Sequence, residues 1–569
     1  SFNDFLGYFY SHMTTFTKNR TRESRAAIER LYIIMRHLFL RGSYKPMGIS
    51  GQSLIEALLV LKPEIYGSIK DPEKAELDGL LYVMERLPHG IEECRFIKLV
   101  SREGYEEAGY RALVPTKRKR NCFRIDKDRM YIEMTRGKSD IYDILTHLTF
   151  LNIESDKIKN KALDQKGRIQ EDWRKLEEVV QMETAGEEFD EKRATVYLSN
   201  FLGRTIQETE EAVRQFDKGN TEHSLYHIIY WLGRLAINDA RRKGDKEISF
   251  SAQLRDSVGQ HIYGEEWATR IKTFLKEKGW EKRSIHIISA NLHSILNTLH
   301  GYAALEDKKF GSVEELAMET SQDKSGLLQE AIKDFALVHG MYEIHDNSGT
   351  NLSVQIFDLD KLETNVMCPE LTGIKINEER PVLVVMDYAF GEQAFECMDE
   401  LLKPLELDEN YYFNIKSVSI IGKAGILTGD KGDIMIPTAH VFEGTADNYP
   451  LNNEFSKADF EDCGHPVYEG PMITVLGTSL QNKDVLNHFV TSTWNAIGLE
   501  MEGAHYQKAI QSAARIRLSV DKDIHVMYAY YASDNPLKTG STLASGSLGL
   551  EGIRPTYLTS VKVLQKILS

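Results

Sequence analysis

The residues of this sequence that could do chemistry gather in its last third, and the first of them form a Ser-Asp pair. Ser533 and Asp534 follow an apolar run in the segment YYASDNPLKTG (530–540), which predicts the end of a buried strand. Burial removes a carboxyl group from water, which raises its pKa and lets it donate a proton to a reacting group. The alternative is that Asp534 only starts a turn, as aspartate commonly does.

A second candidate is the pair of glutamates in IGLEMEGAHY (497–506). Glu500 and Glu502 flank Met501 where a predicted strand passes into a helix. A carboxylate at this position could accept hydrogen bonds from two neighbouring hydroxyl groups, such as those of a ribose diol. Acidic residues are also favoured at the start of a helix by its dipole, so the spacing alone leaves both interpretations open.

A third candidate is a glycine-bearing segment at the end of an apolar strand. SIIGKAGIL (419–427) carries Gly422, Lys423, Ala424 and Gly425, and the segment KGDIMIP (431–437) then begins another strand. Glycine lets backbone N–H groups approach an anion or a sugar closely, and ligands of open α/β sheets bind at the carboxyl ends of the strands. A simple turn is the alternative.

Taken in this order, these segments resemble the nucleoside phosphorylase and nucleosidase superfamily. Its members carry a Gly-rich loop, a GD-type strand, an EMEG-type motif and a Ser-Asp motif, and residues 500–503 match EMEG letter for letter. The segment SDNPLKTGSTLASG (533–546) looks most like the end of AMP nucleosidases. VVMDYAFGEQAFECMDELL (384–402) takes the place of the strand, loop and helix that precede the Gly-rich strand. The resemblance covers about residues 380–569.

The resemblance implies a role for each of these residues. Asp534 would be the general acid that protonates N7 of a departing purine. Glu502 would hold the ribose 2′- and 3′-hydroxyls, and Met501 would pack on the sugar. The segment Gly422–Gly425, together with Ser533, would line the ribose and any phosphate.

The implied reaction is hydrolysis of the N-glycosidic bond of a purine nucleoside or nucleotide, which releases the free base and ribose or ribose phosphate. An AMP-like substrate fits the resemblance best. Phosphorolysis, with inorganic phosphate as second substrate, is one alternative. A nucleotide-binding sensor without catalytic activity is the other. The superfamily also implies a homo-oligomer.

Several residues depart from the superfamily pattern. Phosphorylases usually carry an arginine near the Gly-rich loop, whereas Lys423 is the only cation in this stretch, which favours hydrolysis. Asn535 stands where a lysine often follows the Ser-Asp pair. A water-activating glutamate is expected near the first strand of the domain, and Glu392 and Asp387 are the two candidates for its role.

The order of predicted elements indicates two regions. Up to about residue 340, apolar residues recur every three to four positions, which predicts helices. Beyond that point, continuous apolar runs alternate with helical stretches, which is typical of an α/β domain. We therefore expect a mainly α-helical region over 1–345, regulatory or scaffolding and long enough for two subdomains. An α/β catalytic domain should follow over 346–569, with a mixed central sheet flanked by helices.

Composition narrows the class of protein further. The 569 residues include 70 Lys and Arg against 85 Asp and Glu, a net charge of −15, which argues against nucleic acid as a partner. The five cysteines form neither a disulfide framework nor a CxxC zinc motif, which favours a reducing compartment. No apolar run approaches the roughly 18 residues of a membrane-spanning helix. These features predict a cytoplasmic protein that acts on a small molecule away from membranes.

Histidine spacings in the first region suggest a metal site as a minor alternative. His223 and His227 are four residues apart, the spacing of paired ligands on one helix, and Asp143 and His147 repeat it. The Glu-x-x-His motifs of carboxylate-bridged metal sites in helical bundles are missing. Histidines on helix faces are more often packing residues. We therefore expect neither a metal site nor a cofactor.

Overall fold

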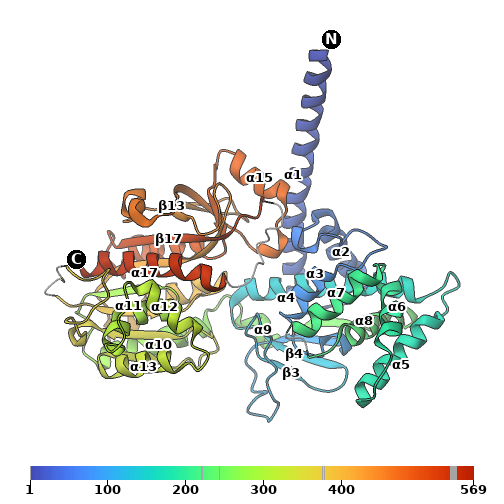
Figure 1. Cartoon of the computed structure of the whole chain (residues 1–569), viewed down its shortest axis with the longest axis horizontal. Coiled ribbons are helices and arrows are strands. Elements are labelled where there is room, and N and C mark those ends of the chain that lie inside the picture. The colour runs from blue at the N-terminus through green and yellow to red at the C-terminus, as the bar shows by residue number, and fades with distance from the viewer. Residues whose placement is uncertain (1, 220–221, 243, 375, 377–378, 539–547) are drawn as a thin grey trace. The chain divides into compact units, whose positions relative to one another are not determined.

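The chain divides into two compact units. The computed structural model describes residues 2–219, 222–242, 244–374, 376, 379–538 and 548–569, with side chains from residue 19 onward. Unit 1 comprises Ser1–Gln260 and Ser479–Val485, and unit 2 comprises His261–Thr478 and Leu486–Ser569 (Figure 1). No helix in the described ranges is long and apolar enough to cross a membrane.

Unit 1 consists of helices around one small sheet. Its longest helix is α1 (Phe2–Arg41), drawn in blue in Figure 1, and α4 (Gly137–Ala162) is buried along most of its length. The other helices are α2 (Ile49–Leu61), α3 (Leu77–Met84), α5 (Glu171–Ala185), α6 (Glu191–Leu202), α7 (Ile206–Lys218), α8 (Leu225–Arg241) and α9 (Ala252–Ser257). This confirms the mostly helical character expected for the first part of the chain.

The sheet of unit 1 was not predicted from the sequence. Its strand order is β1-β5-β2-β4-β3, and the strands are β1 (Ser43–Tyr44), β2 (Phe96–Val100), β3 (Cys122–Arg124), β4 (Arg129–Glu133) and β5 (Glu247–Phe250). These strands are two to five residues long. A run this short carries too few alternations to be distinguished from a loop or a piece of helix.

Unit 2 is built on a ten-stranded mixed sheet. Four neighbouring strands at its centre, in the order β9-β6-β12-β17, run parallel. Their bounds are β6 (Ile285–Ser289), β9 (Val382–Met386), β12 (Ile415–Ile426) and β17 (His525–Asp534). The flanking strands are β7 (Met341–Ile344), β8 (Val354–Asp358), β13 (Ile434–Phe442), β14 (Asn448–Pro450), β15 (Val467–Thr474) and β16 (Gly498–Glu500), and β10 (Leu405–Glu406) pairs with β11 (Asn410–Tyr411) apart from this sheet.

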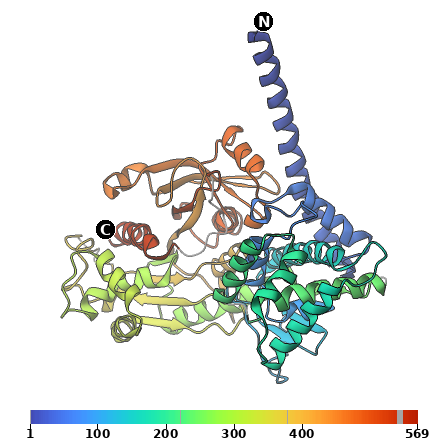
Figure 2. The same ribbon diagram turned by 45° about the vertical axis from the view of Figure 1, so that its right-hand side comes forward.

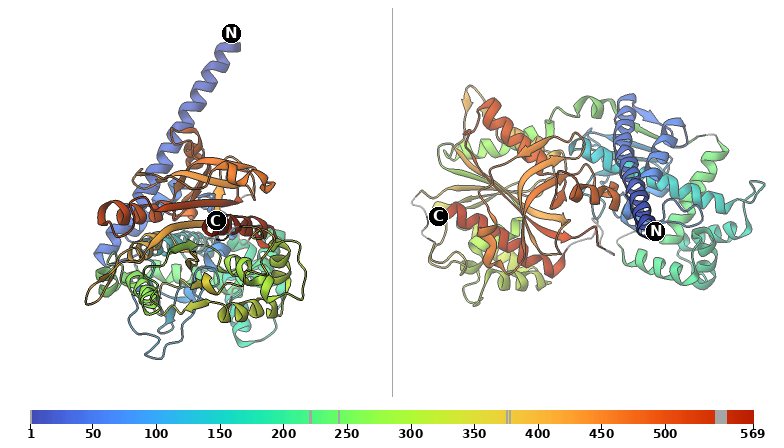
Figure 3. Two further views of the ribbon diagram at one scale, coloured as in Figure 1. Left: turned by 90° about the vertical axis from the view of Figure 1, so that its left-hand side faces the viewer. Right: turned by 90° about the horizontal axis from the view of Figure 1, so that it is seen from above.

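Helices cover both faces of this sheet, as Figures 2 and 3 show. One apolar cluster joins one face of the strands to α10 (Ile262–Glu277), α14 (Gln393–Leu401) and α16 (Gly503–Gln511). The second cluster joins the opposite face to α11 (Leu292–Ala304), α12 (Val313–Gln322), α13 (Leu327–Val338) and α17 (Ile553–Leu568). Alternate residues of a strand point to opposite faces, so Ile287 belongs to the first cluster and Ile288 to the second. The predicted α/β domain with a mixed central sheet flanked by helices is confirmed.

The boundary between the two parts lies earlier than expected. The sequence pattern predicts a boundary between residues 345 and 346, whereas unit 2 begins at His261. The difference arises at β6, which contributes a central strand and is followed at Leu292 by α11. Because the strand and the helix are separated by only two residues, their combined apolar pattern over 284–300 resembled a single helix.

Candidate functional site

The carboxyl ends of the central parallel strands define one edge of the sheet in unit 2. β6 ends at Ser289, which lies level with Met386 of β9 and Ile420 of β12. β12 continues beyond this level to Ile426 and pairs with β17 as far as Gly425 and Asp534. The residues that follow β6 and β9 therefore gather at the same edge as the Gly-bearing part of β12 and the end of β17.

Asp534 is buried at this edge, with only 5% of its surface exposed. Its Oδ1 accepts a hydrogen bond from the Ser533 hydroxyl at 2.7 Å. Its Oδ2 is buried and has no hydrogen-bond partner among the described residues. Burial raises the pKa of Asp534, while the Ser533 hydroxyl and the charges of Lys423 and Lys431 act in the opposite direction. The side chain thus has the environment that a proton donor needs.

Gly425 connects the Ser-Asp pair to the EMEG motif. On one side it pairs with Asp534 of β17, and on the other side it pairs with Leu499 of β16. β16 ends at Glu500, and α16 begins at Gly503. The backbone pairing therefore brings Ser533 and Asp534 to the same part of the sheet as Met501 and Glu502.

The two glutamates of the EMEG motif have different roles. Glu500 is buried, accepts a hydrogen bond from the Thr474 hydroxyl at 2.6 Å, and accepts the backbone N–H groups of Glu502 and Gly503 at the start of α16. Burial raises the pKa of Glu500 to about 7. Its hydrogen bonds make it the residue that anchors this helix start.

Glu502 occupies the N-cap position of α16 and is half-buried, as is Met501. Its Oε1 accepts a hydrogen bond from the backbone N–H of Gly391 at 2.9 Å. Gly391 lies in the turn between β9 and α14 and has a φ of +55°, a value that favours glycine. Glu502 is therefore oriented by the neighbouring turn and not by its own helix, because its side chain makes no capping bond.

The segment Gly422–Gly425 is strand and not the loop that the sequence suggested. It continues β12 and pairs with β17, with a register shift between Ala424 and Gly425. Gly422 and Ala424 are buried, whereas Lys423 is exposed on the strand. A Cβ atom on Gly422 would lie 3.2 Å from the ring of Tyr388, so the aromatic ring covers the strand at the glycine.

Three further side chains lie near this edge of the sheet. Tyr388 follows β9, and its hydroxyl hydrogen-bonds the side chain of Tyr531 on β17. His293 follows β6; burial lowers its pKa, and the charge of Asp387 acts to raise it. His440 is fully buried, lies 3.1 Å from the Tyr530 hydroxyl through its Nε2 atom, and packs on Gly503. These residues are distant in sequence, and only the strand order brings them together.

The structure also shows the surroundings of Asn535 and Glu392, two residues at which the sequence departs from the superfamily pattern or offers a candidate for water activation. Asn535 is buried; its amide donates to the Gly429 carbonyl at 2.8 Å, and its oxygen accepts the Leu537 N–H at 3.0 Å. It therefore holds the turn after β17. Glu392 lies at the N-terminal end of α14. Residues 539–546 of the SDNPLKTGSTLASG segment lie outside the described residues.

Three solved structures align with half of this chain. A futalosine hydrolase mutant of Helicobacter pylori strain 26695 has 12% identity and a TM-score of 0.29, over 50% of this chain and 98% of that chain. The MTA/SAH nucleosidase of Streptococcus pneumoniae in complex with 8-aminoadenine has 11% identity and a TM-score of 0.30, over 50% and 99%. The corresponding nucleosidase of Campylobacter jejuni has 11% identity and a TM-score of 0.28, over 50% and 96%. No curated protein matches the sequence.

One protein-family model matches both units. It is described as a family of unknown function (DUF6909), and it matches residues 52–331 and 316–569. Together these segments include most of α2, the helices of unit 1 that follow it and the complete sheet of unit 2. The chain therefore belongs to this family of unknown function, DUF6909.

Proposed function

We propose that unit 2 hydrolyses the N-glycosidic bond of a purine nucleoside or nucleotide, with an AMP-like molecule as the first candidate substrate. Asp534 serves as the general acid, Glu502 and Met501 hold the ribose, and Gly422 to Gly425 line the sugar together with Ser533. Cleavage of this bond builds positive charge on the sugar and negative charge on the base. A proton delivered to the base stabilises the leaving group.

The observation that carries this proposal is the buried, unpartnered Oδ2 of Asp534. A buried polar atom is usually hydrogen-bonded, and an exception calls for an explanation. A purine nitrogen that receives the proton of Asp534 supplies the missing partner. The Ser533 hydroxyl, which donates to Oδ1, fixes the orientation of the carboxyl group and leaves Oδ2 for the substrate.

The sugar side of the proposal rests on Glu502. Its carboxylate is held by the Gly391 N–H and stands at the start of α16, half-buried beside Met501. Hydroxyl groups that donate to a fixed carboxylate stabilise the positive charge that develops on the ribose ring, because the carboxylate charge reaches the ring through them.

Replacing Glu502 with Gln tests this role. A hydrogen bond to a charged group contributes roughly 1.5–3 kcal/mol, so we expect kcat/KM to fall about 10- to 100-fold. Initial rates at several substrate concentrations give the value. The matched control is Glu406→Gln on the exposed strand β10, which should keep the native rate. Equal rates for the two variants would show that Glu502 does not contact the substrate.

Water activation is assigned to His293, with Asp387 as its positioning partner. The glutamate expected near the first strand is absent there, because β6 is followed by Ala290, Asn291, Leu292 and His293. Partial desolvation lowers the pKa of His293, which favours the neutral imidazole that can accept a proton from water, and the side chain is exposed to solvent. Asp387, at the end of β9, acts on His293 through its charge.

Replacing His293 with Gln should lower kcat by about 100-fold, as expected for the loss of a general base. Substrate affinity, measured by calorimetry, should change little, because the water and not the substrate is the partner of His293. The control is His345→Gln, which changes an exposed histidine of the same unit. A native kcat in the His293 variant would show that another group activates the water, and Glu392 is the next candidate.

Chromatography after incubation with AMP, adenosine, inosine or methylthioadenosine tests the reaction class, in buffers with and without inorganic phosphate. Hydrolysis predicts release of the free base in both buffers and identifies the preferred substrate. Base that appears only with phosphate would identify a phosphorylase instead. Binding without any base release would indicate a sensor.

A further inference from the structure

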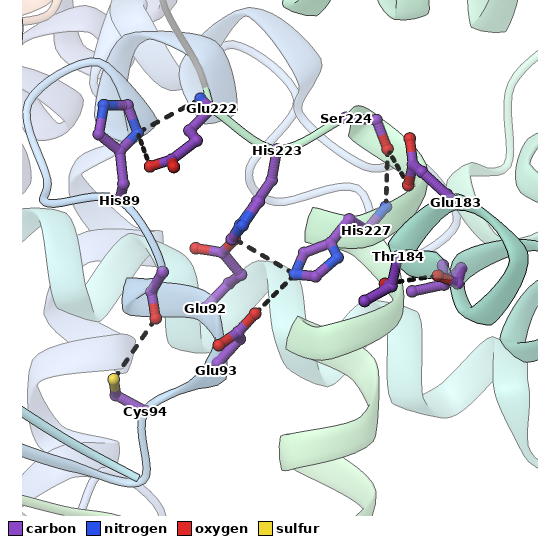
Figure 4. Close-up of polar contacts among 12 residues, drawn as sticks. His89, Glu92, Glu93, Cys94, Glu183, Thr184, Glu222, His223, Ser224 and His227 are labelled. Carbon is purple, nitrogen blue, oxygen red and sulfur yellow. Dashed lines mark hydrogen bonds and ion pairs between the residues drawn. The ribbon is translucent and has the colours of Figure 1, made fainter. Parts of the chain in front are cut away.

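Unit 1 contains a cluster of histidine and glutamate side chains. None of these residues belongs to the proposed nucleosidase site of unit 2. Glu92 and Glu93 belong to the 3-10 turn Ile91–Glu93, His223 directly precedes the N-cap of α8, and His227 lies in the first turn of that helix. Figure 4 shows the four side chains directed toward one another. The Nδ1 atom of His223 is 2.5 Å from Oε1 of Glu92, and the Nε2 atom of His227 is 2.8 Å from Oε1 of Glu93.

The local structure explains why the two histidines face the same point. The four-residue spacing predicts both histidines on one helix, whereas α8 begins at Leu225 and Ser224 is its N-cap. His223 therefore lies just before the helix, and its ring contacts that of His227 at a tilt of 36°, with centroids 3.9 Å apart. The Ser224 hydroxyl accepts the His227 N–H at 3.2 Å, which fixes the first turn of α8.

The second observation is a buried oxygen without a partner. The side chain of Glu92 is 1% exposed, and its Oε2 has no hydrogen-bond partner among the described residues. A buried carboxylate is costly unless it is paired and hydrogen-bonded through both oxygens. The cluster therefore has one acceptor more than the neighbouring side chains can satisfy.

A comparison within the chain shows that this arrangement is unusual. In unit 2, His261, Asp399 and Glu400 also bring their ligating atoms together. There, Arg517 donates to Asp399 at 2.6 Å and Lys403 donates to Glu400 at 2.6 Å, so each carboxylate has a cation. In the unit 1 cluster, Arg124 pairs with Glu93 at 2.8 Å, whereas the side-chain contacts of Glu92 are with the two histidines.

The distances also suit a small divalent ion. Imidazole and carboxylate donors bind zinc at about 2.1 Å, and tetrahedral donors at that radius are roughly 3.4 Å apart. Around Oε1 of Glu92, the distances to His223 Nδ1 and His227 Nε2 are 2.5 and 3.9 Å, on either side of this value. Small rotations of the two rings are enough to make them equal.

From this geometry we propose that Glu92, His223 and His227 bind a divalent transition metal of the zinc class, with Glu93 as the fourth ligand. Two imidazoles and carboxylates suit zinc, copper, nickel or iron better than calcium or magnesium, which prefer oxygen ligands alone. Glu93 is held in place by Arg124 through its second oxygen. The metal joins the 3-10 turn at residues 91–93 to the start of α8, segments more than 130 residues apart.

Titration of the full chain with Zn²⁺, followed by calorimetry, tests the site, and Co²⁺ serves as a spectroscopic probe. We expect one ion per chain for this cluster, a tetrahedral Co²⁺ absorption spectrum, and a rise in Tm of about 5 °C when the free metal exceeds Kd a hundredfold. The site is independent of the proposed nucleosidase activity, so the result stands whether or not base is released.

Glu92→Gln should abolish the binding step and the rise in Tm. The control is Glu222→Gln, which makes the same chemical change next to His223; the Glu222 side chain pairs with His89 outside the donor set, so binding should persist. If the Glu92 variant fails to fold, the half-exposed His223→Gln variant is used in its place. Native protein that binds neither ion, or equal binding by the Glu222 variant and both cluster variants, would overturn the proposal.

Discussion

The Asp534→Asn variant should release purine at least about a hundredfold more slowly than the native protein, while it still binds the substrate. The amide keeps the size and position of the carboxyl group and accepts the Ser533 hydrogen bond, but it cannot give up a proton. The loss therefore appears in kcat, and KM changes little because the missing interaction is made in the transition state. Initial rates of base release, measured by chromatography, give both constants.

The control for this variant is Asp408→Asn, which makes the same change in the exposed turn between β10 and β11. Its kcat and KM should equal those of the native protein. A kcat for Asp534→Asn within about threefold of native would show that Asp534 is not the acid. Loss of binding together with loss of rate would instead point to a damaged fold, which the Tm of the variant reveals.

The same variant should also change how stability depends on pH. Burial raises the pKa of Asp534 in the folded protein above its ordinary value of 3.8, so the folded state binds this proton more tightly than the unfolded state. The contribution of Asp534 to stability is therefore greatest below pH 3.8 and declines as pH rises through the raised pKa of the folded state. The asparagine variant lacks this decline, so the Tm of the variant relative to that of the native protein should rise between pH 4 and pH 7.

Among substitutions that add one methyl group to the proposed site, Gly503→Ala should lower the stability of the protein most. A Cβ atom at this position would lie 2.2 Å from Cδ2 of His440 and 2.8 Å from Oε1 of Glu500. Both neighbours are buried, and His440 is fully enclosed, so neither has room to withdraw. Overpacking of this kind costs about 3 kcal/mol in the free energy of unfolding. The strain falls at the start of α16, so Glu502 should move and base release should also fall.

Urea denaturation measures the first effect and the chromatographic rate measures the second. The control is Gly422→Ala, where the added methyl would meet the ring of Tyr388 at 3.2 Å. Tyr388 as a whole residue is 40% exposed, so its side chain has room to shift and the cost should be well below that of Gly503→Ala. Equal stability of the Gly503 variant and the native protein would show that α16 begins further from His440 than the structure indicates.

The sequence predicted the α/β fold of unit 2 and the pieces of its proposed site that lie within single motifs. Asp534 and Glu502 could be proposed from the sequence because each lies next to an apolar strand in a short segment of unusual composition. The sequence does not show which groups lie beside Tyr388, His293 and His440, because those groups belong to other strands and helices. These three residues reach the edge of the sheet because β6, β9 and β13 pair with strands that are distant from them in the sequence.

The same limit explains why the sequence did not predict the carboxylate neighbours of the histidine cluster in unit 1. The four-residue spacing of His223 and His227 was visible in the sequence, but their carboxylate neighbours Glu92 and Glu93 belong to a turn more than 130 residues earlier. An expectation from helical spacing alone could not include a ligand that another segment supplies. The short strands of the unit 1 sheet and the strand β6 were missed for a related reason, since a few residues cannot establish a period.

The number of purine molecules released per chain, measured in phosphate-free buffer, tests the central claim most directly. The native protein should release many molecules of base from at least one purine nucleoside or nucleotide, with release strongly reduced by Asp534→Asn. Release of no base from AMP, adenosine, inosine or methylthioadenosine, while calorimetry still detects their binding, would contradict the proposed hydrolysis and favour a nucleotide sensor.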